Sequence, residues 1–268
     1  MKAPPFAYAK PRSLEEAFPL LERPGARILA GGQSLIPSLN MRLSSPQLLV
    51  DIGALQRLKD ISLQPGGLRI GALVTHAEIE RSEQVRKHVP LLAEAAPHIA
   101  HPAIRNRGTL GGSLALADPA AEYPACALAL NATMVLQGRK SERRVPAAGF
   151  FKGLFETDIR QGEILVAAEF PRVDRSVFLE LARRHGDYAI VGLAGVADAS
   201  GTRIAFFGID AKPVLAAHAA KAKSVEEAKA LLAKDLHPTG DLYNSPATKL
   251  HLAGVLLARA WNTLSKSH

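Results

Sequence analysis

The sequence predicts an α+β fold with a small α/β unit, a mostly antiparallel α+β unit and a smaller C-terminal domain of antiparallel sheet and helices. Two observations predict it. Helical spacing alternates with short buried strands only over about residues 1–55, which favours parallel strand pairing there. From about residue 56, short strand-like runs follow one another, which is typical of antiparallel sheet. The chain has 268 residues, and domains usually span about 100–200, so two domains are expected.

The first unit is expected to contain a helix, a strand, a glycine turn and a second strand. Ser13-Leu14-Glu15-Glu16 is a capping box, and apolar residues then recur at helical spacing as far as Leu21. Pro24-Gly25 is a turn before a short strand over 26–30. A second strand over 48–52 has the unbroken apolar run of a strand buried on both faces.

The second unit, about residues 56–172, is expected to be mostly antiparallel. A strand follows the turn Gly66-Gly67, and Thr75-His76-Ala77-Glu78 is another possible capping box. A helix is expected over about 85–100, with a break near Pro90. The other expected elements are a helix at 125–130 and strands at about 133–137, 144–147 and 164–170.

Residues 173–268 are expected to form the C-terminal domain. Ser224-Val225-Glu226-Glu227 begins one helix with a capping box, and a second helix runs from about 246 to 264. The runs that predict an antiparallel sheet before them are 178–184, 190–197 and 203–209.

Composition excludes several kinds of site. The single cysteine, Cys126, can form neither an internal disulfide nor a thiolate cluster, and we interpret it as a small buried hydrophobe. No metal site is expected at His98 and His101. No apolar leader or membrane-spanning run is present, so a cytoplasmic protein is expected.

The net charge of +8 raises the question of an anionic partner. The densest basic run, residues 139–144, lies between two strand-like runs and is expected to be an exposed hairpin tip. No aromatic residues alternate with the basic ones, and no nucleic-acid-binding module is present. No nucleic acid partner is expected.

Two segments share a pattern of adjacent glycines flanked by small polar residues. Ala30-Gly31-Gly32-Gln33-Ser34 follows the first strand, and Thr109-Leu110-Gly111-Gly112-Ser113 comes later. Glycine lets a ligand approach the backbone, and successive amides in such a turn can bind phosphate. Carboxylates, Asp118 and Glu122, follow the second segment, where they can bind ribose hydroxyls. The two segments are expected to hold one pyrophosphate, although the first alone is compatible with an ordinary turn.

Four longer segments occur in a fixed order and spacing: AGGQSLIPSLNMRL, PQLLVDI, IRNRGTLGGSLALADPAAEYPA and RRHGDYAIVG. Together they resemble the FAD-binding medium subunit of molybdenum hydroxylases, the carbon monoxide dehydrogenase and xanthine dehydrogenase family. The resemblance implies a PCMH-type FAD-binding domain of the vanillyl-alcohol oxidase type over residues 1–172. It implies a C-terminal domain of the carbon monoxide dehydrogenase flavoprotein type over 173–268.

The resemblance also implies which residues contact FAD. Glu122, with Asp118 nearby, corresponds to the acidic residue at the adenosine ribose, and Leu165 to an aliphatic residue near the adenine. The flavin ring is expected to lie against His101, Ile104 and Tyr188. The residues implied at the pyrophosphate are Ala30, Gly31, Gly32, Gln33, Ser34, Leu35, Thr109, Gly111, Gly112 and Ser113.

Structural roles remain open for three of these residues. Tyr188 is also compatible with a surface aromatic residue, and His101 with a structural residue before a proline. Glu122 also fits a helix N-terminus, where the helix dipole favours a carboxylate. Arg105 and Arg107 either hold phosphate or a partner subunit, or they anchor their loop.

Two positions depart from the family pattern. Ser113 stands where asparagine is frequent, and the serine side chain reaches less far than that of asparagine. Glu180 stands where a lysine is frequent, eight residues before Tyr188, which reverses the local charge. Either this reversal alters the redox potential of the flavin, or Arg183 and Arg184 compensate for it.

The resemblance implies an electron-transfer subunit with no catalytic acid, base or nucleophile of its own. Substrate would be oxidised in a large molybdopterin subunit, and electrons would reach FAD through [2Fe–2S] clusters of a small subunit. The complex is expected to be a dimer of heterotrimers that passes electrons to an external acceptor. Two alternatives remain: a self-contained FAD-dependent oxidoreductase of the same fold, and a non-enzymatic nucleic-acid or interaction protein.

Overall fold

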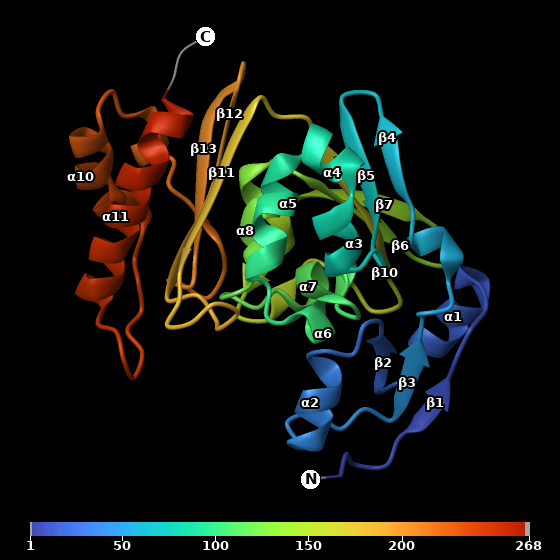
Figure 1. Ribbon diagram of the computed structural model, residues 1–268. Coiled ribbons are helices and arrows are strands. Elements are labelled where there is room, and N and C mark those ends of the chain that lie inside the picture. Colours follow the sequence, from blue (N-terminus) through green and yellow to red (C-terminus); the bar gives the residue numbers. More distant parts are fainter. Residues whose placement is uncertain (1, 266–268) are drawn as a thin grey trace.

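A parallel sheet near the N-terminus and antiparallel sheets beyond it make up the fold, as the computed structural model shows for residues 2–265 (Figure 1). The α+β class predicted from the sequence is confirmed. From left to right, Figure 1 shows the C-terminal helices, the C-terminal sheet, a layer of central helices and the central sheet. The parallel unit lies below the central helices and sheet.

The parallel unit consists of three strands and two helices. Its strand order is β1-β3-β2, and both pairings are parallel. Strand β1 was not predicted, because its mostly exposed residues carry no apolar pattern. The elements are β1 (Ala7–Ala9), α1 (Leu14–Leu21), β2 (Ala26–Leu29), α2 (Leu35–Asn40) and β3 (Leu48–Asp51).

The central sheet is antiparallel throughout, in the order β4-β5-β10-β6-β7. The middle strand, β10, buries residues on both faces and has an irregular register between Leu165 and Ala167. A short hairpin of β8 and β9 lies outside this sheet. The strands are β4 (Ile61–Gln64), β5 (Gly67–Gly71), β6 (Thr133–Gln137), β7 (Glu142–Pro146), β8 (Phe151–Gly153), β9 (Glu156–Thr157) and β10 (Ile164–Pro171).

Short helices cover the central sheet. The break predicted near Pro90 is present, because Val89 leaves the helical conformation, with φ −143°, and Pro90 begins a new helix. The second helix ends at Ala95 and a 3-10 turn follows it, so the helix does not continue to residue 100 as predicted. The glycine-rich stretch after His101 contains two further helices. The helices are α3 (His76–Arg81), α4 (Glu83–His88), α5 (Pro90–Ala95), α6 (Pro102–Arg105), α7 (Leu110–Leu116), α8 (Glu122–Ala129) and α9 (Ala147–Phe150), with 3-10 turns η1 (Gln56–Leu58) and η2 (Ala96–His98).

The C-terminal sheet is antiparallel, in the order β11-β12-β13-β14. It packs against α5 and α8 on one face and against α10 and α11 on the other. The strand predicted over 178–184 ends at Leu181, because the following residues form a loop before β12. The elements are β11 (Arg175–Leu181), β12 (Val191–Asp198), β13 (Gly201–Phe207), β14 (Val214–Leu215), η3 (Ala219–Lys221), α10 (Val225–Asp235) and α11 (Pro246–Leu264).

The predicted capping motifs all mark helix starts, but only one is a complete capping box. The Thr75 side chain accepts a hydrogen bond from the Glu78 amide, and the Glu78 carboxylate accepts one from the Thr75 amide. Ser13 also caps its helix, yet Glu16 accepts its hydrogen bond from the amide of Arg12, one residue too early for the box. Ser224 and Glu227 repeat that arrangement, with the amide of Lys223 as the donor.

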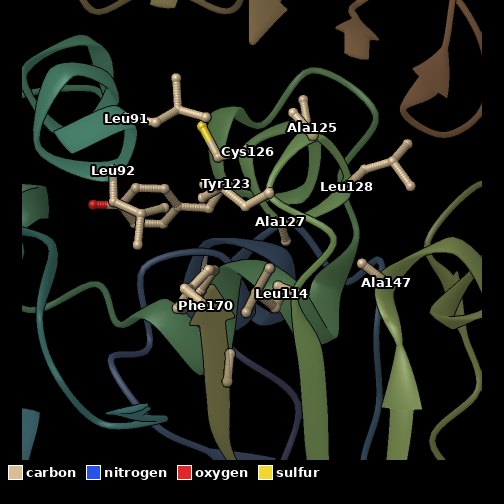
Figure 2. Packing of buried hydrophobic residues seen from close by; sticks show 14 of the residues in the cluster. Leu91, Leu92, Leu114, Tyr123, Ala125, Cys126, Ala127, Leu128, Ala147 and Phe170 are labelled. Carbon is tan, nitrogen blue, oxygen red and sulfur yellow. The ribbon is translucent and has the colours of Figure 1, made fainter. Parts of the chain in front are cut away.

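Helix α8 lies at the centre of the largest hydrophobic core (Figure 2). Every residue from Tyr123 to Ala129 in this helix is buried. Its side chains pack among residues of α5, α7 and β10, including Leu92, Leu114 and Phe170. Cys126 is fully buried there, which agrees with its interpretation as a small hydrophobe.

A glycine beneath an aromatic ring gives a direct test of this packing. Gly192 on β12 pairs with Phe207 on β13, and a Cβ at Gly192 would overlap the Phe207 ring. We expect Gly192→Ala to lower the free energy of unfolding by about 2–3 kcal/mol, because overpacking forces the ring to move. Gly149→Ala, where no atom lies within 4 Å of the added Cβ, should change it by less than about 1 kcal/mol. Urea denaturation measures both, and equal stability of the two variants would contradict the packing.

Candidate functional site

One large cavity lies between the parallel unit and the central helices. Its volume is about 1,280 Å³, which exceeds the ~300–1,000 Å³ typical of small-molecule sites. Figure 1 shows α2 and β2 on one side of this region and α6 and α7 on the other. All sixteen residues predicted to contact the cofactor line this cavity: Ala30, Gly31, Gly32, Gln33, Ser34, Leu35, His101, Ile104, Thr109, Gly111, Gly112, Ser113, Asp118, Glu122, Leu165 and Tyr188.

The first glycine segment is a turn between β2 and α2 that leaves its amides free. Gly32 has φ +74°, a conformation that favours glycine. The Gln33 side chain folds back and donates to the Gly31 carbonyl over 3.0 Å. Within residues 2–265, no hydrogen bond uses the amides from Gly31 to Ser34. Such successive free amides can bind an anion.

The second glycine segment corrects the expectation that it also offers bare amides. Its glycines lie in the first turn of α7, not in a loop, because Thr109 caps this helix. The Gly111 amide donates to the Ala72 carbonyl over 2.9 Å, and the Gly112 amide donates to Thr109 Oγ1 over 3.1 Å. The Ser113 amide donates to the Thr109 carbonyl. The hydroxyls of Thr109 and Ser113 are therefore the polar groups that this segment offers to the cavity.

The first glycine segment packs closely against the backbone of Arg107 and Gly108, just before the second segment. A Cβ at Gly31 would overlap the carbonyl oxygen of Arg107 and lie 2.9 Å from the Gly108 Cα. Only glycine therefore lets the turn after β2 approach the chain that leads into α7. Both segments line the same cavity, and this contact joins them.

His76 is a cavity residue that the sequence analysis missed. Its amide donates to the Gly108 carbonyl, and a Cβ at Gly108 would lie 2.7 Å from the His76 ring. The ring is buried, and its Nδ1 has no hydrogen-bond partner among the described residues. Burial, and then the charge of Arg105, lowers the pKa of His76 to about 4, so the ring is neutral. The contact joins residues 32 positions apart, and no local pattern in the sequence marks it.

The two predicted carboxylates lie in a weakly solvated part of the cavity. Asp118 Oδ1 accepts a hydrogen bond from the Ala120 amide over 2.9 Å, while burial raises the pKa of Asp118. Among the described residues, no group of another residue forms a hydrogen bond or ion pair with the Glu122 carboxylate, which is near its own backbone amide. Burial, and then the charges of Glu180 and Asp118, raises the pKa of Glu122 to about 8. The Glu122 carboxyl is therefore largely protonated at neutral pH in the chain without a ligand.

Glu180, the departure from the family pattern, lies outside the cavity wall. Its side chain is 3% exposed, and its Oε2 is 3.9 Å from Nδ1 of His98. Burial raises the pKa of Glu180 to about 7. No ion pair within residues 2–265 joins it to Arg183 or Arg184.

Exposed and half-buried groups also line the cavity. Tyr188 is 76% exposed, and His101 is exposed while Ile104 is partly buried. Arg183, which the sequence analysis did not assign to the site, also lines the cavity and lies over the ring of Tyr243, 5.0 Å from its centroid.

Arg105 anchors its loop, which decides between the roles left open for it. Its guanidinium donates to Glu80 Oε2 over 2.9 Å and to the carbonyls of Ile99 and Ala100. Arg107 is exposed and contacts the first glycine segment through its carbonyl group.

Another part of the cavity wall was not predicted from the sequence. It consists of Leu165 and of the chain from Phe155 to Ile164 except for Asp158. Phe155 has φ +53°, a strained conformation for a bulky residue. Only Leu165 was marked by the resemblance, because the rest is a loop without a recognisable motif.

Residues 2–265 show neither a candidate metal cluster nor a candidate membrane-spanning helix. No group of three or more His, Cys, Asp or Glu side chains in this part of the chain is placed to hold a metal ion. None of its helices is both long enough and apolar enough to cross a membrane.

Comparison with known families decides the identity of this fold and cavity. Residues 4–173 match the model of the FAD binding domain in molybdopterin dehydrogenase. The chain belongs to this family. Residues 176–264 match the CO dehydrogenase flavoprotein C-terminal domain.

Relatives of the family align along nearly the whole chain. The nicotine 6-hydroxylase medium subunit of Paenarthrobacter nicotinovorans is 37% identical and covers 97% of both chains. The carbon monoxide dehydrogenase medium chain of Hydrogenophaga pseudoflava is 34% identical and covers 98% of both. The solved structure of quinoline 2-oxidoreductase from Pseudomonas putida 86 contains a chain with a TM-score of 0.93 at 38% identity, over 99% of both chains. The chain is a flavoprotein oxidoreductase subunit of the molybdenum hydroxylase type, and its cofactor is FAD.

The donor set of the cavity fits this cofactor. Four free amides from Gly31 to Ser34 can bind a diphosphate, with the hydroxyls of Thr109 and Ser113 on the other side. Glu122, which lacks a partner among the described residues, can bind the hydroxyls of a ribose. The volume of about 1,280 Å³ leaves room for an extended dinucleotide.

The raised pKa of Glu122 predicts how stability depends on pH in the FAD-free chain. Between about pH 4.5 and 8 the folded state holds a proton on Glu122 that the unfolded state has lost. Stability therefore falls as pH rises through this range, by at most about 1.4 kcal/mol per pH unit for this group. Glu122→Gln should reduce that fall and leave the FAD-free chain more stable than wild type at pH 8.

Urea denaturation of both FAD-free proteins at pH 5, 6.5 and 8 measures the effect. Glu180 is present in both proteins and contributes equally to the pH dependence of each. The difference between their free energies of unfolding at each pH therefore reports on Glu122. Parallel pH profiles would show that Glu122 is solvated and would contradict its buried environment.

Proposed function

We propose that the chain is the FAD-binding electron-transfer subunit of a molybdenum-dependent hydroxylase or dehydrogenase complex. The observation that supports it most is the convergence of all sixteen predicted residues on one cavity, with four free amides in its wall. In this proposal residues 1–172 form the FAD-binding domain and residues 173–268 the C-terminal domain. The short connection between β10, which ends at Pro171, and β11, which begins at Arg175, supports this division.

In this proposal the residues of the cavity bind and orient the cofactor. The first glycine turn and the hydroxyls of the second segment hold the diphosphate. Glu122 holds the adenosine ribose, Leu165 packs near the adenine, and Tyr188 covers one face of the flavin ring. When bound, FAD would accept electrons from a partner and deliver them to an external acceptor.

The partners in this proposal are a large molybdopterin subunit and a small [2Fe–2S] subunit, assembled as a dimer of heterotrimers. The single cysteine supports it, because iron–sulfur clusters need several thiolates that this chain lacks. The relatives named as medium subunit and medium chain also support a multi-subunit assembly. The cytoplasmic location expected from the sequence stays a prediction.

Purification from the native cell tests the proposal. The tagged chain should copurify with flavin, molybdenum and iron, at about one flavin and four irons per copy, which corresponds to two [2Fe–2S] clusters. The same chain produced alone and loaded with FAD should bind the flavin but oxidise no substrate of the complex. Substrate turnover by the isolated chain without molybdenum would instead support the self-contained oxidoreductase.

A further inference from the structure

Arg143 is half-buried although the basic run 139–144 was expected to be an exposed hairpin tip. Arg139, in the same run, is exposed as expected, with 60% of its side chain accessible. The Arg143 side chain is only 21% exposed and donates four hydrogen bonds. Two go to the carboxylate of Glu163 over 2.8 Å each, and two go to Asp158, one to the carboxylate over 2.9 Å and one to the carbonyl over 2.8 Å.

These contacts close the segment 158–163 into a defined turn. The Glu163 carboxylate, besides holding Arg143, accepts a hydrogen bond from the Arg160 amide over 2.9 Å. The Glu163 amide donates to the Arg160 carbonyl over 3.0 Å. Lys152 adds an ion pair to Asp158 over 3.2 Å. Arg143 therefore joins both ends of the segment, and it does so from β7, two strands away from β10 in the sheet.

The clamped segment is a wall of the cavity, although Arg143 itself is not. Residues 159–163 line the cavity and lead directly into Leu165. Leu165 lies in β10 at the irregular register, so the turn before this strand sets where its side chain lies. Arg143 can act on a bound ligand only through this segment.

We propose that Arg143 is a positioning residue for the adenosine half of FAD, which it serves by clamping the turn 158–163 beside Leu165. The inference rests on the proposed function, because it takes Leu165 as the residue near the adenine. Removing the guanidinium would leave Asp158 and Glu163 as neighbouring carboxylates without their shared partner, and their repulsion would open the turn. Lysine would restore the charge but not the planar, bidentate geometry.

The test compares Arg143→Ala and Arg143→Lys with wild type and with Arg144→Ala as the matched control. Arg144 is the next residue of β7 and is 53% exposed, and its carboxylate partners, Glu142 and Glu169, do not line the cavity. The full-length FAD-free chain is titrated with FAD. ADP and FMN, which represent the two halves of the cofactor, are then used as competitors.

We expect Arg143→Ala to raise the Kd for FAD about tenfold, equivalent to about 1.4 kcal/mol. The inhibition constant of ADP should rise by a similar factor, while that of FMN stays within about twofold of wild type. Arg143→Lys should give an intermediate loss with the same ADP-specific pattern, and Arg144→Ala should match wild type. A purely structural role would weaken both halves together.

Two results would overturn the inference and leave the proposed function standing. One is unchanged ADP binding in the Arg143 variants, and the other is equal weakening of ADP and FMN binding. If Arg143→Ala does not fold, Arg143→Lys decides by the same comparison. If the wild-type chain itself fails to bind FAD, the proposed function fails, and this inference fails with it.

Discussion

The cavity depends on the close approach of Gly31 to the backbone of Arg107 and Gly108. Gly31 belongs to the parallel unit, and Arg107 precedes the helix that carries the second glycine pair. A side chain at Gly31 would overlap the Arg107 carbonyl and separate the two walls. The free amides of the first turn and the hydroxyls of the second segment can then no longer face one ligand. In the proposed site, phosphate recognition would thus depend on packing between two units.

Burial controls the charge of the cavity before any ligand enters. It keeps His76 neutral beneath Gly108 and holds a proton on Glu122 near neutral pH. The negative charge expected at the ribose subsite is therefore reduced in the empty site. Burial also raises the pKa of Glu180 to about 7, so this side chain, which lies outside the cavity wall, carries only part of a negative charge near neutral pH. A ligand that donates hydrogen bonds to Glu122 would favour its ionised form.

Local patterns in the sequence predict the parts of this structure that depend on local chemistry. Capping motifs at Ser13, Thr75 and Ser224 mark true helix starts, and the buried strand β3 follows from its apolar run. Long-range contacts were not predictable in this way. The amides of Gly111 and Gly112 are taken by Ala72 and Thr109, which the glycine pattern alone does not show. The roles of His76 and Arg143 likewise arise from partners distant in the sequence.

Titration of FAD against the Gly31→Ala variant tests the central contact most directly. The account predicts a folded chain, with the far-ultraviolet spectrum of wild type, that binds FAD at least about 100-fold more weakly, equivalent to about 2.7 kcal/mol. Gly149→Ala, whose added Cβ meets no atom within 4 Å, should bind FAD as wild type does. Wild-type affinity in Gly31→Ala would contradict the account, because the two segments would then not need to touch in order to hold the cofactor.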